Sequence, residues 1–182
     1  MFKLLKTVIK TGACTEKYPF APIEIAPDFR GKPELEASQC ISCAACARAC
    51  PANALVMETD AKAGTRRWEL STARCIYCGR CEEVCPTKAI KLSPNFELAV
   101  TNKADLYEEA VFKLADCVNC GTPFVAQKLL DYVLDTLKHA GLSEDQLEMS
   151  LQQLQTCPAC RRADNMLDGE NICHQRHLEE DM

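Results

Sequence analysis

The pattern of apolar and polar positions predicts a helix at the start of the chain. Within residues 1–12, apolar side chains recur at helical spacing and share one face, whereas three lysines share another. A helix this short is marginal alone in water, so something should cover its apolar face. We favour an interfacial helix on a membrane or a membrane subunit, with packing on its own domain as the alternative. The apolar face consists of Phe2, Leu4, Leu5, Val8 and Ile9.

Residues 18–36 contain four prolines and predict an extended segment. Proline removes a backbone donor and restricts the preceding residue, so neither a helix nor a central strand is expected here. The segment suits a strap along the surface of a partner, or an exposed linker. The prolines are Pro19, Pro22, Pro27 and Pro33.

Two short, partly alternating runs predict a β-hairpin. Residues Ala54–Thr59 and Arg66–Leu70 flank the turn-rich stretch Asp60–Gly64. A further short strand is expected at Ala89–Leu92. Trp68 lies on the hairpin and is expected to be a core or subunit-contact residue rather than an electron carrier.

The last third of the chain predicts helices. Residues 101–116 place Leu106, Ala110 and Leu114 on one stripe after the cap candidates Thr101 and Asn102. Residues 126–140 form a second apolar stripe that ends at a glycine. Ser143 and Gln146 have capping-box spacing and predict a third helix to about Gln155.

Composition and charge narrow the class of protein. The chain has 182 residues, a formal net charge of −5 and 14 cysteines. The charge gives no support for nucleic-acid binding, and no secretory signal is visible. No apolar run approaches the roughly 18–20 residues that cross a bilayer. Reduced, metal-binding cysteines in a cytoplasmic protein are therefore expected. There is no GxGxxG motif, P-loop, radical-enzyme cysteine loop or plausible Ser-His or Cys-His pair to indicate an enzyme.

Eight of the cysteines form an internal repeat. The run C-x2-C-x2-C-x3-C-P occurs twice, at residues 40–51 and 75–86, with an offset of 35 residues. This is the spacing by which bacterial ferredoxins hold two 4Fe–4S clusters, and the fourth cysteine of each run binds the other cluster. Short helices are expected near Ala47–Ala49 and Glu82–Val84. A pair of zinc sites is the alternative for so many thiolates.

The crossover assigns ligands to two clusters and ties the two halves together. The first cluster is expected on Cys40, Cys43, Cys46 and Cys85. The second is expected on Cys75, Cys78, Cys81 and Cys50.

Two later C-x2-C pairs predict a third metal site. Cys117 and Cys120 precede Cys157 and Cys160, and four thiolates can surround one tetrahedral ion. Zinc is the default interpretation. A mononuclear iron is the alternative, because CxxCG paired with CPxC also resembles rubredoxin. The site is expected to be structural.

These observations predict an α+β protein in four parts. Residues 1–36 hold the N-terminal helix and strap, and 37–100 form the double 4Fe–4S ferredoxin domain. Residues 101–163 form a helical extension with the four-cysteine site, and 164–182 a charged tail. Cys14 and Cys173 have no partner at ligand spacing.

Several segments together resemble a known family. These are YPFAPIEIAPDFRGKPEL before the first motif, CIYCGRCEEVCPTKAIKL around the second, and FELAV after it. They are similar to the two-cluster ferredoxin subunits of energy-converting NiFe hydrogenases, of the subunit 6 and component H type found in formate hydrogenlyase and hydrogenase-4 complexes. The eight-iron subunit of respiratory complex I, an NADH:quinone oxidoreductase, is related and provides the alternative function. The paired late knuckles favour the hydrogenase relatives. Ala44 stands where a glycine is common in the family.

The resemblance implies a non-catalytic electron relay. It implies a subunit on the cytoplasmic face of the inner membrane that takes electrons from a ferredoxin-like subunit of formate dehydrogenase. The implied acceptor is the small subunit of a hydrogenase whose large subunit reduces protons. It also implies contact with a membrane subunit or the membrane surface through residues 1–12. The clusters would carry single electrons near about −400 mV.

Overall fold

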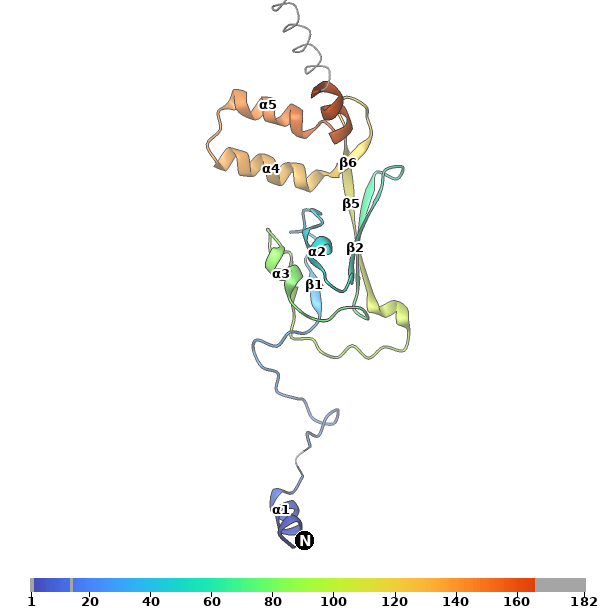
Figure 1. Ribbon diagram of the computed structural model, residues 1–182, viewed down its shortest axis with the longest axis vertical. Helices are drawn as coiled ribbons and strands as arrows, with labels where there is room; N and C mark the ends of the chain where they lie inside the picture. The colour runs from blue at the N-terminus through green and yellow to red at the C-terminus, as the bar shows by residue number, and fades with distance from the viewer. Residues whose placement is uncertain (1, 14, 166–182) are drawn as a thin grey trace, which may run out of the picture.

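A computed structural model describes residues 2–13 and 15–165 (Figure 1). Cys14, Cys173 and most of the expected charged tail lie outside the described residues. The N-terminal half contains α1 (Phe2–Thr11), β1 (Pro33–Leu35), α2 (Ala45–Ala49), β2 (Leu55–Asp60), β3 (Thr65–Ser71), α3 (Arg80–Val84) and β4 (Ile90–Leu92). The C-terminal half contains η1 (Lys103–Leu106), β5 (Tyr107–Asp116), β6 (Pro123–Ala126), α4 (Gln127–His139) and α5 (Glu144–Leu154). No helix among these residues is long and apolar enough to span a bilayer.

The repeat in the sequence is also a repeat in the fold. Strand β1 pairs antiparallel with β4, and Leu35 lies opposite Ile90. Strand β2 pairs antiparallel with β3, and Leu55 lies opposite Leu70. Leu70 lies 35 residues after Leu35, and Ile90 lies 35 residues after Leu55, so the two ladders have the same register. The expected hairpin, the strand at Ile90–Leu92 and the two short helices are all confirmed.

The helix expected over residues 101–116 is wrong. Asn102 does act as a cap, and its side chain accepts a hydrogen bond from the N–H of Ala104 at 3.1 Å, but it starts only the 3-10 turn η1. Residues 107–116 form strand β5, in which residues 107–113 pair with β3 and the last three residues pair with β6. A spacing of four residues is compatible with a period of two as well as with a helix. Phe112 is buried and Val111 is 64% exposed, as the alternation of a strand requires.

The C-terminal half therefore extends the hairpin instead of standing apart from it. Strands β2, β3, β5 and β6 form one sheet in that order. Helix α4 follows β6 directly, and α4 and α5 form the antiparallel pair at the end of the molecule opposite α1 (Figure 1). Both of these helices were expected. Ser143 and Gln146 complete a capping box at the start of α5, as their spacing predicts.

The strap contacts the segment that follows β4 at several points, and at its first residue the hydroxyl of Tyr18 donates to Glu97 Oε1 at 2.8 Å. The N–H of Gly31 donates to the carbonyl of Ser93 at 2.9 Å, and the N–H of Lys32 donates to that of Asn95 at 2.8 Å. Further back, Phe29 packs edge-on against Phe96, with ring centroids 6.2 Å apart. Helix α1 lies at the far end of the strap, away from the body (Figure 1). It has the expected helical form, and its apolar face is exposed throughout.

One apolar core lies between the cysteine loops and the four-stranded sheet. Its members include side chains of β2, β3, β4 and β5, and partly buried cysteines pack against them. Trp68 is 1% exposed, so it is a core residue, as expected. The core members are Cys40, Ala54, Leu55, Trp68, Leu70, Cys81, Ala89, Ile90 and Phe112.

Candidate metal centres

The structure gathers the cysteines of the first expected cluster from both halves of the repeat. Cys40 has Cys43 and Cys85 as charged neighbours, although Cys85 lies 45 positions further along the chain. Cys46 in turn has Cys40 and Cys43 as neighbours. Burial raises the pKa of Cys40 and of Cys46, so a free thiolate is disfavoured at both positions. A cation bound here would offset that penalty.

The second group is arranged in the same way. Cys50 lines one pocket with Cys75, Cys78 and Cys81, and Pro33 and Leu92 complete part of its wall. Burial raises the pKa of Cys81 to about 11. Both groupings are those expected from the spacing. The ligand assignment itself stays a prediction.

Backbone N–H groups point at four of these sulfurs in two matched pairs. Ser42 N–H donates to Cys40 Sγ at 3.4 Å, and Tyr77 N–H donates to Cys75 Sγ at 3.4 Å. The other pair links residue i+4 to residue i. It consists of Ala54 N–H to Cys50 Sγ at 3.3 Å and Ala89 N–H to Cys85 Sγ at 3.2 Å. Such bonds favour the thiolate, which is the form that binds iron.

Left-handed backbone conformations shape the loops that carry the cysteines. Six residues with positive φ fall into three pairs related by the offset of 35. The middle pair is Ala44 at φ 65° and Gly79 at φ 79°, each just before a short helix. The family resemblance places a glycine at Ala44, and the conformation explains why. The pairs are Ser42 with Tyr77, Ala44 with Gly79, and Asn53 with Lys88.

Sequence reasoning did not foresee that the two equivalent isoleucines of the loops differ in exposure. Ile41 is 8% exposed, whereas the equivalent Ile76 is 61% exposed. It also missed Lys128 of α4, whose Nζ donates to the carbonyl of Ala37 at 2.9 Å and to that of Ser38 at 3.1 Å. The Lys128 charge acts on nearby Cys40 by favouring its thiolate. No motif marks this lysine, because the contact depends on how α4 packs.

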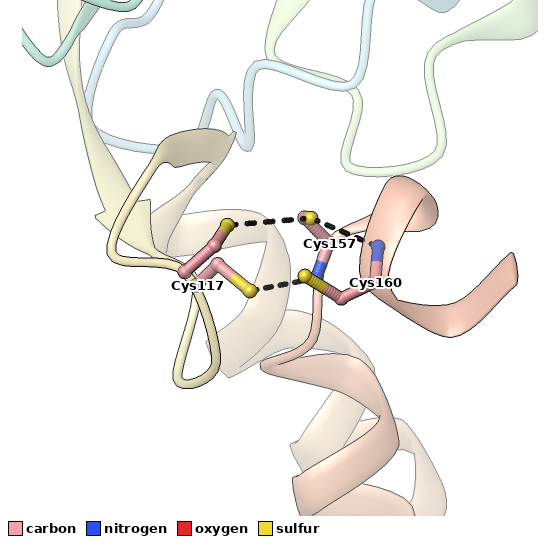
Figure 2. Close-up of side chains that lie close together, drawn as sticks. Cys117, Cys157 and Cys160 are labelled. Atoms are coloured by element: carbon pink, nitrogen blue, oxygen red, sulfur yellow. Dashed lines mark hydrogen bonds between the residues drawn. The ribbon is translucent and has the colours of Figure 1, made fainter. Parts of the chain in front are cut away.

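The third site is assembled from the loop after β5 and the turn after α5 (Figure 2). The sulfurs of Cys117, Cys120, Cys157 and Cys160 all lie within 4.8 Å of one another. The N–H of Cys157 donates to Cys117 Sγ at 3.2 Å, and the N–H of Cys160 donates to Cys157 Sγ at 3.4 Å. The two C-x2-C pairs therefore come together as their spacing predicts.

The protonation of these four thiols fits a bound cation. The N–H of Cys157 lowers the pKa of Cys117 to about 6. A hydrogen bond with Cys157, together with the negative charge of Cys117, raises the pKa of Cys160 to about 12. Four thiolates this close repel one another, so all four can lose their protons only when a cation binds between them. The donor set of four sulfurs suits zinc or iron.

Comparisons with known proteins find related chains. Residues 39–89, which include all eight cysteines of the repeat, match the 4Fe-4S dicluster domain family. The chain is similar to formate hydrogenlyase subunit 6 of Escherichia coli (strain K12), with 48% identity over 180 residues and 99% of each chain covered. It also resembles a chain in the membrane-bound sulfane sulfur reductase, an archaeal respiratory membrane complex. That likeness has 33% identity and a TM-score of 0.45, and it covers 56% of this chain and 54% of that one.

Proposed function

Because the chain belongs to the family of formate hydrogenlyase subunit 6, we propose that it is the electron relay of a membrane-bound NiFe hydrogenase complex of that type. The family and the dicluster domain make it an iron–sulfur electron-transfer subunit. In the proposal, electrons arrive from a ferredoxin-like subunit of formate dehydrogenase and leave to the hydrogenase small subunit. The large subunit of that hydrogenase then reduces protons.

The observation that carries the proposal is the interleaving of the two cysteine groups. Each group takes three sulfurs from one half and the fourth from the other, which keeps the two groups adjacent. Cys46 of the first group and Cys81 of the second group lie close enough for their charges to interact. When bound, the two 4Fe–4S clusters supply single-electron carriage at low potential. The chain holds the thiolates, directs N–H groups at them and limits the access of water.

The uncovered face of α1 supports attachment to a membrane subunit or to the membrane surface. Its five large apolar side chains are between 58% and 85% exposed, and lysines occupy the other side of the helix. Burying such side chains is favourable by roughly 1.5–3 kcal/mol each. The strap places this helix well away from the cysteine groups (Figure 1). It could therefore reach a surface that the body does not touch.

The four-cysteine site fits a structural role in the same proposal. It fastens the turn after α5 to the loop after β5, and so holds α4 and α5 against the sheet. A structural zinc ion in such a site contributes on the order of 10–16 kcal/mol. Zinc is the proposed ion and mononuclear iron the alternative. The presence of this site also supports a hydrogenase complex over the related quinone reductase.

Metal analysis and complementation test the proposal. Anaerobically purified protein should contain about eight irons and eight labile sulfides for two 4Fe–4S clusters, with one zinc or a ninth iron. An Escherichia coli strain that lacks its own formate hydrogenlyase subunit 6 should regain hydrogen evolution from formate when it expresses this chain. A variant with Cys78→Ser should restore much less. Protein that accumulates with its clusters yet supports no hydrogen evolution would contradict the assignment to this complex.

A further inference from the structure

The internal repeat places two different residues at equivalent positions beside the two cysteine groups. Trp68 on β3 lies opposite Met57 on β2. At the corresponding place in the other ladder, Pro33 on β1 lies opposite Leu92 on β4. Trp68 and Pro33 differ by 35 in number, as do Leu92 and Met57. The repeat therefore allows a comparison within one chain, because Trp68 has a side-chain N–H and its counterpart Pro33 has none.

The indole N–H of Trp68 is buried without a conventional partner. Trp68 is 1% exposed, and its Nε1 makes no hydrogen bond within the part of the chain that the structure describes. A buried donor without an acceptor is costly, and native proteins retain few of them. An indole N–H that persists in the core beside a group of cysteines therefore requires an explanation.

The repeat places this N–H beside the first cysteine group, because Pro33, the counterpart of Trp68, lines the pocket of the second group. Cys46 packs against the same core as Trp68. Burial raises the pKa of Cys46, and the Trp68 side chain opposes that rise. Cys46 and its counterpart Cys81 each also receive a backbone N–H, from Ala47 and from Glu82, so the indole is the donor that the second half lacks.

We propose that Trp68 is a positioning and tuning residue whose indole N–H donates to the sulfur of the first cluster when that cluster is bound, and so raises the reduction potential of the first cluster above that of the second. The inference rests on the proposed cluster ligands. A reduced cluster carries one more negative charge than an oxidised one, so a donor to its sulfurs stabilises the reduced form more. Pro33 and Leu92 have no side-chain donor to offer the second cluster. An electron shared between the two clusters then resides mainly on the first.

The sequence allows the N–H to be removed with little change of shape. Trp68 is the only tryptophan of the chain. Expression of the full chain in a tryptophan auxotroph supplied with β-(3-benzothienyl)alanine replaces that N–H with sulfur and keeps the two fused rings. The matched control is 4-fluorotryptophan, which retains the N–H. Trp68→Phe gives a genetic version of the same loss.

Potentiometric titration followed by EPR measures the effect. In the benzothienyl protein and in Trp68→Phe, the ratio of reduced to oxidised first cluster at a fixed potential should fall severalfold, where a tenfold change corresponds to about 59 mV for one electron. The second cluster and the fluorotryptophan protein should change much less. With indole-¹⁵N tryptophan, pulsed EPR should detect nitrogen coupling to one cluster signal, the one that Cys46→Ala abolishes.

Three results would overturn the inference. They are equal shifts at both clusters, no shift at either, or a shift as large with fluorotryptophan as with the benzothienyl analogue. Iron and sulfide analysis of the same samples separates this outcome from failure of the proposed function. Samples that lack two clusters contradict the relay, whereas samples with both clusters and no selective shift contradict only the role of Trp68.

Discussion

Ile41 and Ile76 occupy equivalent positions in the two cysteine loops, yet Ile41 is 8% exposed and Ile76 is 61% exposed. The same contrast continues along the loops, because Ser42 is buried and its counterpart Tyr77 is half-buried, whereas Cys43 is half-buried and its counterpart Cys78 is exposed. The loops share their spacing, their positive-φ residues and their N–H to sulfur bonds. The repeat therefore determines how each half holds its metal, and the parts of the chain outside the repeat determine what surrounds it.

The contacts of the first loop identify those parts. Arg66 of β3 donates from Nη1 to the carbonyl of Ser42 at 3.1 Å. Lys128 of α4 holds the carbonyls of Ala37 and Ser38, and its Nζ lies 5.8 Å from the centroid of the Phe112 ring. The sheet and α4 thus cover the first half, while the second loop reaches the surface. Covered and exposed clusters should differ in potential, because solvent exposure is one of its determinants.

The largest expected effect comes from removing, one at a time, two cysteines of the same half that belong to different expected clusters. Cys46→Ala and Cys50→Ala alter residues only four positions apart, yet they should damage different clusters. Each variant should lose most of one cluster and retain most of the other, about four irons per chain. EPR of the reduced proteins, with iron analysis, measures this. Loss of the same signal in both variants would contradict the crossover of ligands.

Loss of the third metal should affect the first half more than the second. Cys157→Ser removes one of four ligands, and the release of α4 should free the loop that Lys128 holds. Hydrogen exchange at residues 37–42 should accelerate at least tenfold, about 1.4 kcal/mol in local opening free energy. Exchange at residues 76–79 should change far less. Lys128→Gln is the control that removes the contact and keeps the metal, and it should give a smaller acceleration over the same residues.

The strap provides the corresponding test for the second half. A side chain at Gly31 would lie within contact distance of the carbonyl oxygens of Ser93 and Asn95, and 2.9 Å from the carbonyl carbon of Asn95. Gly31→Ala should therefore separate the strap from this segment and loosen the ladder of β1 with β4. The cost should be roughly 1–3 kcal/mol, as for other overpacked sites.

Anaerobic denaturant unfolding measures the cost of Gly31→Ala, and exchange at residues 90–92 should rise above that at residues 55–57. Gly12→Ala places a methyl group in open space on a backbone with φ 64°, so it shows the cost of backbone strain without overlap. An unfolding free energy equal to that of the unaltered chain would show that the strap tolerates the side chain.

The same two halves show which features the sequence could predict. The two short helices of the cysteine loops, the hairpin and helix α5 with its capping box depend on local patterns, and the sequence predicted each of them correctly. Strand β5 could not be separated from a helix by the spacing of Leu106, Ala110 and Leu114, because a period of four suits both. The pairing of β5 with β3 decides the outcome, and it is a contact between distant segments. The positions of Trp68 beside Cys46 and of Lys128 beside Cys40 likewise depend on packing.

The smallest expected effect concerns the position at which the first loop has an alanine and the second loop has a glycine. Ala44 and Gly79 both have positive φ, a conformation that costs a residue with a Cβ roughly 1–2 kcal/mol. Ala44→Gly should stabilise the chain by about 0.5–1 kcal/mol, since part of this gain is offset by the greater freedom of glycine in the unfolded state. Gly79→Ala should destabilise it by more, because its Cβ would also meet Leu92 Cδ1 at 3.3 Å.

Denaturant unfolding of the anaerobic proteins gives both values, and the double variant tests whether they add. The sites lie in loops of different clusters, so near additivity is expected. If Ala44→Gly destabilised the chain instead, the burial of the Ala44 methyl group would outweigh its backbone strain, and the first half would depend on that methyl group for its cover.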